Sequence, residues 1–403
     1  MSAPHSAFLS RRVLLGGVLA LPALAGEAAT DSELDRRVRG RMQRFLDQGD
    51  VPGLVAVVGS RAGVQSQVVL GQRDLGGRPM RADSLFRIAS MTKPITAIAV
   101  MQLAEGGKLA VDDAVEKHLP EFQGQMLVES RTRDRVVLVR PPRPITLKDL
   151  LTHTSGLPGG PPPGMADLYS RRNRTLAEAV AAFSQRPLDF VPGERWAYCN
   201  AGIDTLGRVV EVASGLSYES YLEQHLFHPL GMKDTRFYPS RATAAREVPV
   251  LDRREGRLVA AASPVVGSGV GARYPIPAGG LLSTAPDLAR LYRAMLGGGE
   301  ADGVRILASE SVRSMTTLQT GALATGFVPG MGWGLGFAVV RQPQGVTAML
   351  SRGSYGHGGA FGTQGWLDPT RDRFAILMIA RAGLPNGDAS DLRRDLQAEA
   401  WAA

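Results

Sequence analysis

Strand-like segments lie at both ends of the chain, and this placement is the feature that most limits the fold. Two short apolar runs, 54–58 and 68–70, are typical of an antiparallel pair near the start. Three more strand patterns, at 333–340, 362–367 and 374–380, come near the end. The economical arrangement joins all five in one sheet. The pattern therefore predicts an α+β fold with a five-stranded antiparallel sheet.

Helical periodicity dominates the middle of the chain. Apolar residues recur at helical spacing in five segments separated by Gly/Pro-rich connectors: 91–105, 175–185, 201–214, 217–227 and 286–296. Thr284 followed by Pro286 and Asp287 is a helix-start signal. Amphipathic patterns at 32–48 and 390–401 predict terminal helices that flank the sheet.

These patterns together predict two lobes. Residues 32–86 and 300–403 would form an α/β lobe, and residues 87–299 would form a large, mainly helical insertion. The crevice between sheet and insertion is the expected place for an active site.

The first 25 residues have the features of an export signal. Arg11 and Arg12 precede an apolar stretch that is about half the length needed to cross a bilayer as a helix. Ala23-Leu24-Ala25 is a plausible cleavage site. Adjacent arginines before the apolar run resemble a twin-arginine signal, which exports folded proteins. The sequence predicts a periplasmic or secreted protein without a stable membrane span after cleavage; an uncleaved anchor is the alternative.

Charge and cysteine content exclude several classes of partner. The formal net charge is +8, yet no long Lys/Arg run occurs, and the cluster at 171–174 is too short to define a nucleic-acid groove. The single cysteine, Cys199, cannot form an intramolecular disulfide. Neither a His-Glu-x-x-His pattern nor Cys–His spacing typical of a metal site is present. We expect neither a nucleic-acid partner nor a metal, and the proposed chemistry needs no organic cofactor.

A Ser-x-x-Lys motif, Ser90 to Lys93, is the strongest chemical signal. It precedes a helical segment, and residues three apart on a helix share a face, so the hydroxyl and the amine can meet. A serine needs a nearby base to become a nucleophile. Lysine serves as a base only when burial or a neighbouring cation disfavours its charge, and the apolar Ile88, Ile95 and Ile98 favour such burial.

A second motif, Tyr198-Cys199-Asn200, adds a phenol and an amide. In an extended segment, residues two apart share a face, so Tyr198 and Asn200 would enter the crevice while Cys199 points away. Tyr198 could shuttle the serine proton if cations lower its pKa, and Asn200 could hold Lys93 and the acyl carbonyl. The alternative is a core tyrosine next to a turn-forming asparagine.

The third motif is His357-Gly358-Gly359, followed by Ala360. Glycines let a backbone approach a ligand closely, and a strand passing the nucleophile can offer a backbone N–H to an oxyanion. By position, we assign that donor to Ala360, with the Ser90 N–H as the second donor. The alternative for His357 is a structural loop histidine.

The order Ser-x-x-Lys, Tyr-x-Asn, His-x-Gly resembles the class C β-lactamase superfamily, which includes family VIII carboxylesterases and D-alanyl-D-alanine carboxypeptidases. The phrases LLTHTSGL at 150–157 and PAGGLLST at 277–284 also resemble its members. The similarity runs from about residue 35 to the C-terminus. It implies a small-molecule ester or amide substrate and a β-lactamase/transpeptidase-like fold.

The resemblance also implies roles for individual residues. Ser90 becomes the nucleophile, Lys93 and Tyr198 its proton-handling pair, and Asn200 a substrate-binding group. Gly359 and Ala360 fall in the segment that binds substrate. His357 stands where β-lactamases of the family usually have lysine, so a permanent cation for a substrate carboxylate is missing. This departure favours esters or amides without a carboxylate over β-lactams.

Two readings of the function remain beside a carboxylesterase-like hydrolase. One is a D-alanyl-D-alanine carboxypeptidase or weak β-lactamase, and the other is a catalytically silent member that binds cell-wall peptides or assembles with itself. His153 lies in a Thr-His-Thr-Ser-Gly turn, and we interpret it as structural. A Gly-x-Ser-x-Gly nucleophile elbow is absent from the sequence, which argues against an α/β-hydrolase.

Overall fold

The computed structural model describes residues 32–261 and 271–402, and Ser32–Ala403 group as one compact unit. The export signal predicted for residues 1–25 lies outside the described residues. Within the described part of the chain, no helix combines the length and apolar character required to cross a membrane. The division into two lobes stays a prediction.

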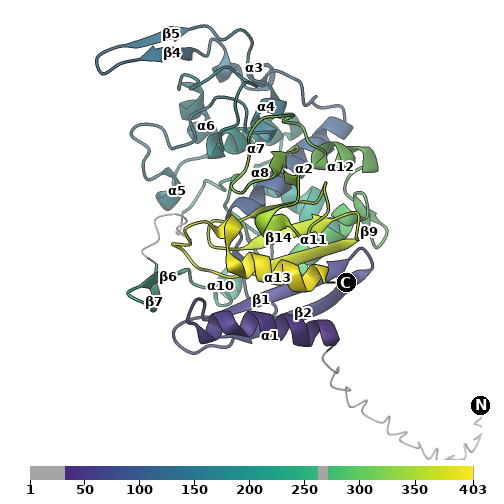
Figure 1. Ribbon diagram of the computed structural model, residues 1–403. Helices are drawn as coiled ribbons and strands as arrows, with labels where there is room; N and C mark the ends of the chain where they lie inside the picture. Colours follow the sequence, from purple (N-terminus) through teal and green to yellow (C-terminus); the bar gives the residue numbers. More distant parts are fainter. Residues whose placement is uncertain (1–31, 262–270, 403) are drawn as a thin grey trace, which may run out of the picture. The chain divides into compact units, whose positions relative to one another are not determined.

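Seven strands form the central sheet in the order β11-β12-β13-β14-β15-β1-β2, and every neighbouring pair is antiparallel (Figure 1). Their bounds are Gly53–Ser60 (β1), Gly63–Gly71 (β2), Met331–Trp333 (β11), Ala338–Val340 (β12), Tyr355–Gly358 (β13), Gln364–Asp368 (β14) and Arg373–Met378 (β15). Strand β15 pairs with β1, so segments that are far apart in the sequence lie side by side in one sheet.

The predicted fold class is confirmed, but the predicted number of five strands is wrong. The segment 333–340 is a hairpin of two strands, because the chain turns back at 334–337, where Gly336 has a φ of 80°. The sequence pattern did not predict strand β13. This short strand contains two glycines, Gly356 and Gly358, and lacks the apolar alternation typical of a strand.

The sheet is buried on both faces, which explains the unbroken apolar run in β1. Val55 and Val57 face one hydrophobic cluster, whereas Leu54, Ala56 and Val58 face the other. Helices α1 (Glu33–Asp47) and α13 (Asp391–Trp401) pack on the second face, against β2 and β15. Helix α11 (Ala285–Leu296) packs on the first face, against β1, β14 and β15.

The helices begin close to the predicted signals. Ser32 caps α1 with a capping box, Thr284 caps α11 by accepting from the Asp287 N–H, and Ser390 caps α13. The other helices of the described residues are α2 (Thr92–Glu105), α3 (Val115–His118), α4 (Leu147–Leu151), α5 (Leu168–Arg171), α6 (Leu176–Ser184), α7 (Asn200–Ser214), α8 (Tyr218–Leu222), α9 (His228–Leu230), α10 (Arg241–Ala244) and α12 (Ser309–Thr316).

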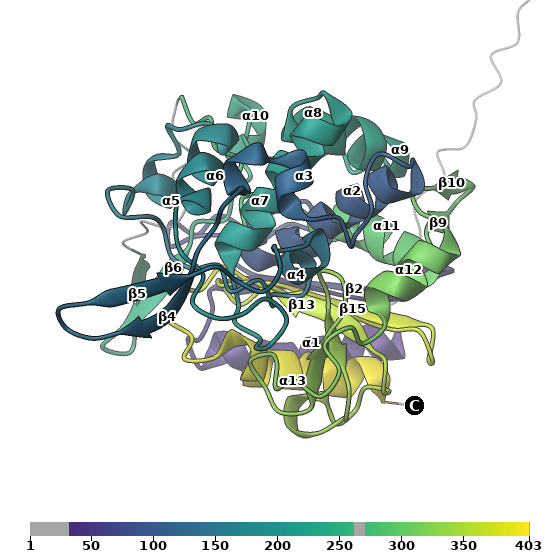
Figure 2. The same cartoon turned by 90° about the horizontal axis from the view of Figure 1, so that it is seen from above.

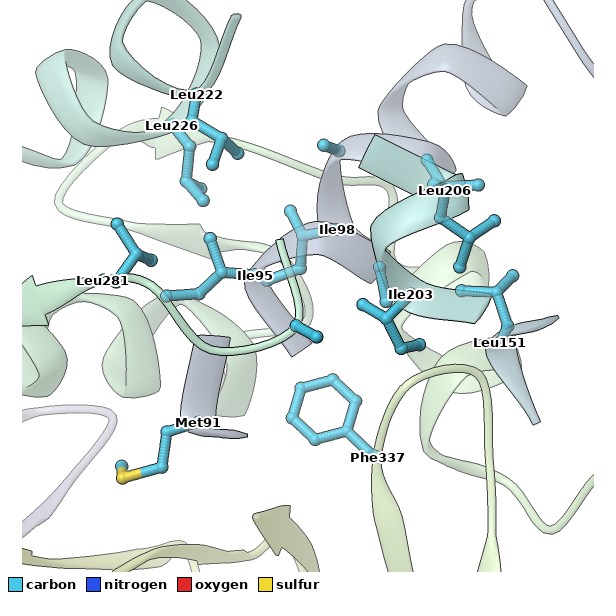
Figure 3. Close-up of a cluster of buried hydrophobic side chains, with 14 of the residues drawn as sticks. Met91, Ile95, Ile98, Leu151, Ile203, Leu206, Leu222, Leu226, Leu281 and Phe337 are labelled. Atoms are coloured by element: carbon cyan, nitrogen blue, oxygen red, sulfur yellow. The ribbon is translucent and has the colours of Figure 1, made fainter. Parts of the chain in front are cut away.

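Helix α2 forms the centre of the helical layer, which Figure 2 shows from above. Its contacts with α7 are extensive, and nearly every residue of α2 from Thr92 to Leu103 is buried. Figure 3 shows Ile95 and Ile98 of α2 among leucines and isoleucines from α4, α7 and α8. A helix buried all round has no polar face, so its one basic residue, Lys93, is held inside the protein.

Four small two-stranded sheets complete the fold. They pair β3 with β8, β4 with β5, β6 with β7 and β9 with β10. Their bounds are Phe86–Arg87 (β3), Leu127–Arg131 (β4), Val136–Val139 (β5), Leu251–Arg254 (β6), Arg257–Ala260 (β7), Leu282–Ser283 (β8), Glu300–Ala301 (β9) and Val304–Arg305 (β10). The β4–β5 hairpin extends away from the helices in Figure 1.

Candidate active site

Ser90 lies in a single 3₁₀ turn, Ala89–Met91, that leads directly into α2. Ala89 has a φ of 45°, a left-handed conformation that residues other than glycine rarely adopt. Next to this turn, the Thr363 hydroxyl donates to the Ile88 carbonyl at 3.3 Å. The turn therefore fixes Ser90 at the start of α2, next to the segment that follows β13.

Lys93, one helical turn after Ser90, is completely buried and points at it. Its Nζ lies 3.1 Å from the Ser90 Oγ and donates to the Ala278 carbonyl at 2.7 Å. Burial lowers the pKa of Lys93 toward neutrality, although the negative charge of Asp204 opposes this shift. A neutral amine can donate one proton to Ala278 and accept another from the Ser90 hydroxyl, which is the arrangement a base requires.

Tyr198 completes the group. The Lys93 Nζ lies 4.6 Å from the centre of its ring, which places the phenol beside the Ser90–Lys93 pair. Burial raises the pKa of Tyr198 above that of an ordinary tyrosine, and the neighbouring Ser90 hydroxyl offsets only part of this effect. The condition that we set for Tyr198, a pKa lowered by cations, is therefore not met. Tyr198 stays protonated at neutral pH, and Lys93 is the better base.

A cavity of about 120 Å³ opens beside Ser90. Its lining comes from several distant segments: Ala89, Ser90, Tyr169, Asn200, Ile276, Ala278, Gly279, Ala360 and Phe361. Ile276 has a φ of 57°, which is unusual for a β-branched residue. Its carbonyl accepts from the N–H groups of Gly279 and Gly280, at 2.8 and 2.7 Å, so the strained wall is held by hydrogen bonds.

The segment after β13 reaches Ser90 because it begins with glycine. A Cβ on Gly359 would lie 2.5 Å from the Ile88 carbonyl oxygen and 2.1 Å from the Thr363 hydroxyl, so only glycine fits there. The next residue, Ala360, is exposed and lines the cavity with Ser90. Ser90 and Ala360, the two residues predicted to supply the oxyanion donors, therefore line the same cavity.

Asn200 and Cys199 are neighbours in the sequence, but their surroundings differ. Asn200 begins α7 and lines the cavity, and its Oδ1 has no hydrogen-bond partner among the described residues. Lys93 directs its hydrogen bonds to Ser90 and Ala278 rather than to this oxygen. Cys199 is buried and caps α7, and burial raises the pKa of its thiol to about 11, which makes it a poor nucleophile.

His357 lies on β13 but does not line the Ser90 cavity. Its Nδ1 donates to the Gly358 carbonyl at 2.6 Å, and its Nε2 has no partner among the described residues. Burial lowers the pKa of His357 to about 3, and the nearby Lys93 contributes. The ring faces a separate, smaller cavity whose lining includes Trp333, Asp388 and Arg393. His357 is therefore a neutral group at working pH.

Asp204 on α7 is fully buried and was not among the residues predicted for the site. Its carboxylate accepts from the hydroxyls of Tyr274 and Tyr169, at 2.5 and 3.2 Å, and from the Ala278 N–H at 2.8 Å. The backbone of Ala278 thus links the two side chains: its N–H donates to Asp204, and its carbonyl accepts from Lys93. Burial raises the pKa of Asp204. The sequence did contain a signal for a buried carboxylate, because Asp204 lies among the apolar positions of segment 201–214.

The described residues contain no cluster of His, Cys, Asp or Glu side chains that could hold a metal ion. The polar side chains near Ser90 are of the kinds that acyl transfer uses: a hydroxyl, an amine and a phenol.

Comparison with known proteins gives one consistent result. The family model described as Beta-lactamase matches residues 34–400. Protein Rv1367c of Mycobacterium tuberculosis is 34% identical over 84% of this chain and 88% of its own length. Esterase EstB of Burkholderia gladioli is 30% identical over 87% of this chain and 91% of its own length.

The fold is shared as well. The structure of EstCE1, described as a hydrolase with promiscuous acyltransferase activity, superposes with a TM-score of 0.78 at 24% identity. The match covers 92% of this chain and 98% of EstCE1. The resemblance stated from the three motifs is confirmed by these matches.

Proposed function

Since the chain belongs to the β-lactamase family, we propose that it is a carboxylesterase-like serine hydrolase that cleaves ester or amide bonds through an acyl-enzyme on Ser90. One observation carries the proposal: the buried amine of Lys93 lies 3.1 Å from the Ser90 hydroxyl, beside a cavity that opens on that hydroxyl. The similarity to a protein named Esterase EstB supports it.

The geometry supports a reaction in two stages. Lys93, as the neutral amine, takes the proton of Ser90 while Ser90 Oγ bonds to the acyl carbon, and the N–H groups of Ser90 and Ala360 stabilise the oxyanion. As the bond between the acyl carbon and the leaving oxygen or nitrogen breaks, the Tyr198 hydroxyl gives its proton to the departing alcohol or amine, and the Lys93 ammonium returns a proton to Tyr198. Water then attacks the acyl-enzyme by the reverse route, which releases the acid and restores the Ser90 hydroxyl.

Esters without a carboxylate are the preferred substrates in this proposal. A β-lactam presents a carboxylate, which needs a permanent cation near the third motif. His357 is neutral there, and the carboxylate of Asp388 lies so close that a Cβ on Gly358 would be 2.2 Å from its Oδ1. The neighbouring cation, Arg393, is already directed at Asp388 and is not free to bind a substrate carboxylate.

The test is turnover of a substrate panel by the Ser90→Ala variant. We expect the unchanged protein to hydrolyse p-nitrophenyl acetate and butyrate, and to act poorly on a chromogenic cephalosporin and a D-Ala-D-Ala peptide. Ser90→Ala should abolish ester turnover and the acyl adduct seen by intact-protein mass spectrometry, whereas the control Ser314→Ala on α12 should keep both. Full activity of Ser90→Ala would refute the proposal, and efficient peptide cleavage without ester cleavage would favour the carboxypeptidase alternative.

We also propose that residues 1–25 export the folded enzyme by the twin-arginine route to the periplasm or the medium. The paired Arg11 and Arg12 before an apolar stretch support this proposal. Replacing both arginines by lysine should leave the full-length protein in the cytoplasm, as measured by cell fractionation. The exported protein should begin near residue 26, and export of the double variant at the normal level would contradict the proposal.

A further inference from the structure

The turn at 153–156, within the LLTHTSGL phrase, is hydrogen-bonded along the segment that carries Tyr198. The contacts follow one another in antiparallel order: Asp189 N–H to the Gly156 carbonyl (2.8 Å), Gly193 N–H to the Thr154 carbonyl (2.8 Å), Ala197 N–H to the His153 carbonyl (2.9 Å) and Cys199 N–H to the His153 Nδ1 (3.2 Å). The last two contacts lie on either side of Tyr198 in the sequence. His153 is therefore the residue of the turn that fixes this tyrosine.

The turn itself is firmly held. Arg143 binds Asp149 through two hydrogen bonds of 2.6 and 2.9 Å, and the hydroxyls of Thr152 and Thr154 lie 2.8 Å apart. His153 has a φ of 60°, a left-handed conformation that is unfavourable for most residues with a side chain. A strained residue is retained where the surrounding structure and the function require it.

The His153 side chain also packs directly on the Tyr198 ring. Its ring is buried, with its centre 4.6 Å from the centre of the Tyr198 ring and 5.1 Å from that of Trp333. Because Nδ1 accepts from the Cys199 N–H, this nitrogen must be unprotonated. Burial lowers the pKa of His153 well below its usual value, so the acceptor persists at working pH.

We propose that His153 is a positioning residue for the reaction: its Nδ1 fixes the Cys199 peptide and its ring packs on Tyr198, which together hold the phenol against Ser90 and Lys93. The inference rests on the proposed function. The His153 Nδ1 accepts from the Cys199 N–H and the ring packs on Tyr198 rather than on Ser90, so His153 acts through Tyr198 and is not itself catalytic.

The left-handed backbone at 153 provides a matched pair of variants. Asparagine and glycine both tolerate this conformation, but only asparagine brings an acceptor, its Oδ1, to the position of Nδ1. We expect His153→Gly to lower kcat for p-nitrophenyl butyrate by about 10²-fold, because a displacement of the order of 1 Å has such an effect. KM should stay nearly constant, and His153→Asn should restore kcat to within about fivefold of the unchanged protein.

A double variant tests whether the effect passes through Tyr198. In a Tyr198→Phe background, adding His153→Gly should lower the residual activity by less than about threefold, because the group that His153 positions has already been removed. Thermal unfolding of each variant checks that it folds. If His153→Gly shows no cooperative transition, His153→Asn is measured in its place against the unchanged protein: a kcat within about fivefold is expected, and a loss of about 10²-fold would overturn the inference.

Equal losses of kcat in the asparagine and glycine variants would overturn the inference. So would a loss confined to KM, or an undiminished loss in the Tyr198→Phe background. Ser90→Ala, measured in parallel, separates this failure from that of the proposed function. An active Ser90→Ala variant removes the proposed function, whereas an inactive one together with equivalent His153 variants removes only the role of His153.

Discussion

Two regions meet at the end of strand β13, and they differ in what their polar groups can do. The nucleophile region, Ser90, Lys93 and Tyr198, has an amine in contact with the reacting hydroxyl and a cavity open to it. The third-motif region contains His357, Asp388 and Arg393. There Arg393 is buried, stacks 3.9 Å above the Trp366 ring and donates to the Asp388 backbone carbonyl at 2.8 Å.

Burial has opposite chemical consequences in these two regions. In the nucleophile region, burial acts on Lys93 so that an ordinary cation becomes a usable base. In the third-motif region, burial removes the charge of His357 and the remaining cation, Arg393, is directed at Asp388. The protein therefore activates a nucleophile without offering a cation to the far end of the substrate. Removing groups from the first region should abolish activity, and removing them from the second should matter little.

The largest effect is expected from Lys93→Met, which keeps the length and apolar stem of the side chain but has no amine. Ester turnover, kcat/KM, should fall about 10²- to 10⁴-fold, the usual contribution of a positioned base. Lys93→Arg should be equally inactive, because a guanidinium keeps its proton. Steady-state rates at several pH values, with thermal unfolding as a control for folding, provide the measurement. A Lys93→Met variant within tenfold of the unchanged protein would place the base elsewhere.

The second effect concerns the size of the acyl group. The cavity beside Ser90 is small, about 120 Å³, and Ile276 forms part of its wall. We expect kcat/KM for p-nitrophenyl esters to fall by about tenfold or more from butyrate to decanoate. Ile276→Gly removes the wall and suits the left-handed backbone, so it should make this decline shallower. A flat chain-length profile in the unchanged protein would show that the acyl chain does not enter this cavity.

The third effect is a shift in pH dependence. Asp204 favours the charged form of Lys93, so Asp204→Asn should lower the pKa of Lys93 further. Because only the neutral amine is the base, the acid limb of kcat/KM against pH should move to lower pH, by about one unit. The groups that share this environment are Tyr169, Tyr274, Tyr218, Cys199, His153 and His357. Burial is the largest cause of the raised pKa of Tyr169, Tyr274, Tyr218 and Cys199, and the charge of Asp204 adds to it, so these groups stay protonated across the acid limb in both proteins.

Asp287→Asn is the matched control for this shift. Asp287 is also buried and hydrogen-bonded, to the Thr235 hydroxyl at 2.9 Å, and burial raises its pKa, but it lies on α11 outside the cavity lining. This variant should leave the acid limb in place. An acid limb that does not move in Asp204→Asn, or that moves toward higher pH, would show that Asp204 does not tune the base.

The sequence predicted elements whose signals are local and missed those that depend on contacts at long range. Helix α11 could be predicted because its N-cap, Thr284, and the acidic residue of its first turn, Asp287, lie within four residues of each other. Strand β13 could not be predicted, because its glycines, Gly356 and Gly358, are required by contacts with distant residues. A Cβ on Gly356 would be 2.1 Å from the Gly365 carbonyl oxygen. Burial, which no motif displays, decided the protonation of Tyr198 and His357.

The smallest effect should come from the third-motif region, and it tests the comparison most directly. His357→Gln keeps a polar group of similar size, and ester kcat/KM should change by no more than about threefold because the ring does not line the Ser90 cavity. His357→Lys should not create cephalosporin hydrolysis, since a second buried ammonium near Lys93 is disfavoured by burial and by repulsion. Initial rates with a p-nitrophenyl ester and a chromogenic cephalosporin measure both. A tenfold gain in cephalosporin hydrolysis by His357→Lys would mean that this region does reach the substrate and that its neutrality alone excludes β-lactams.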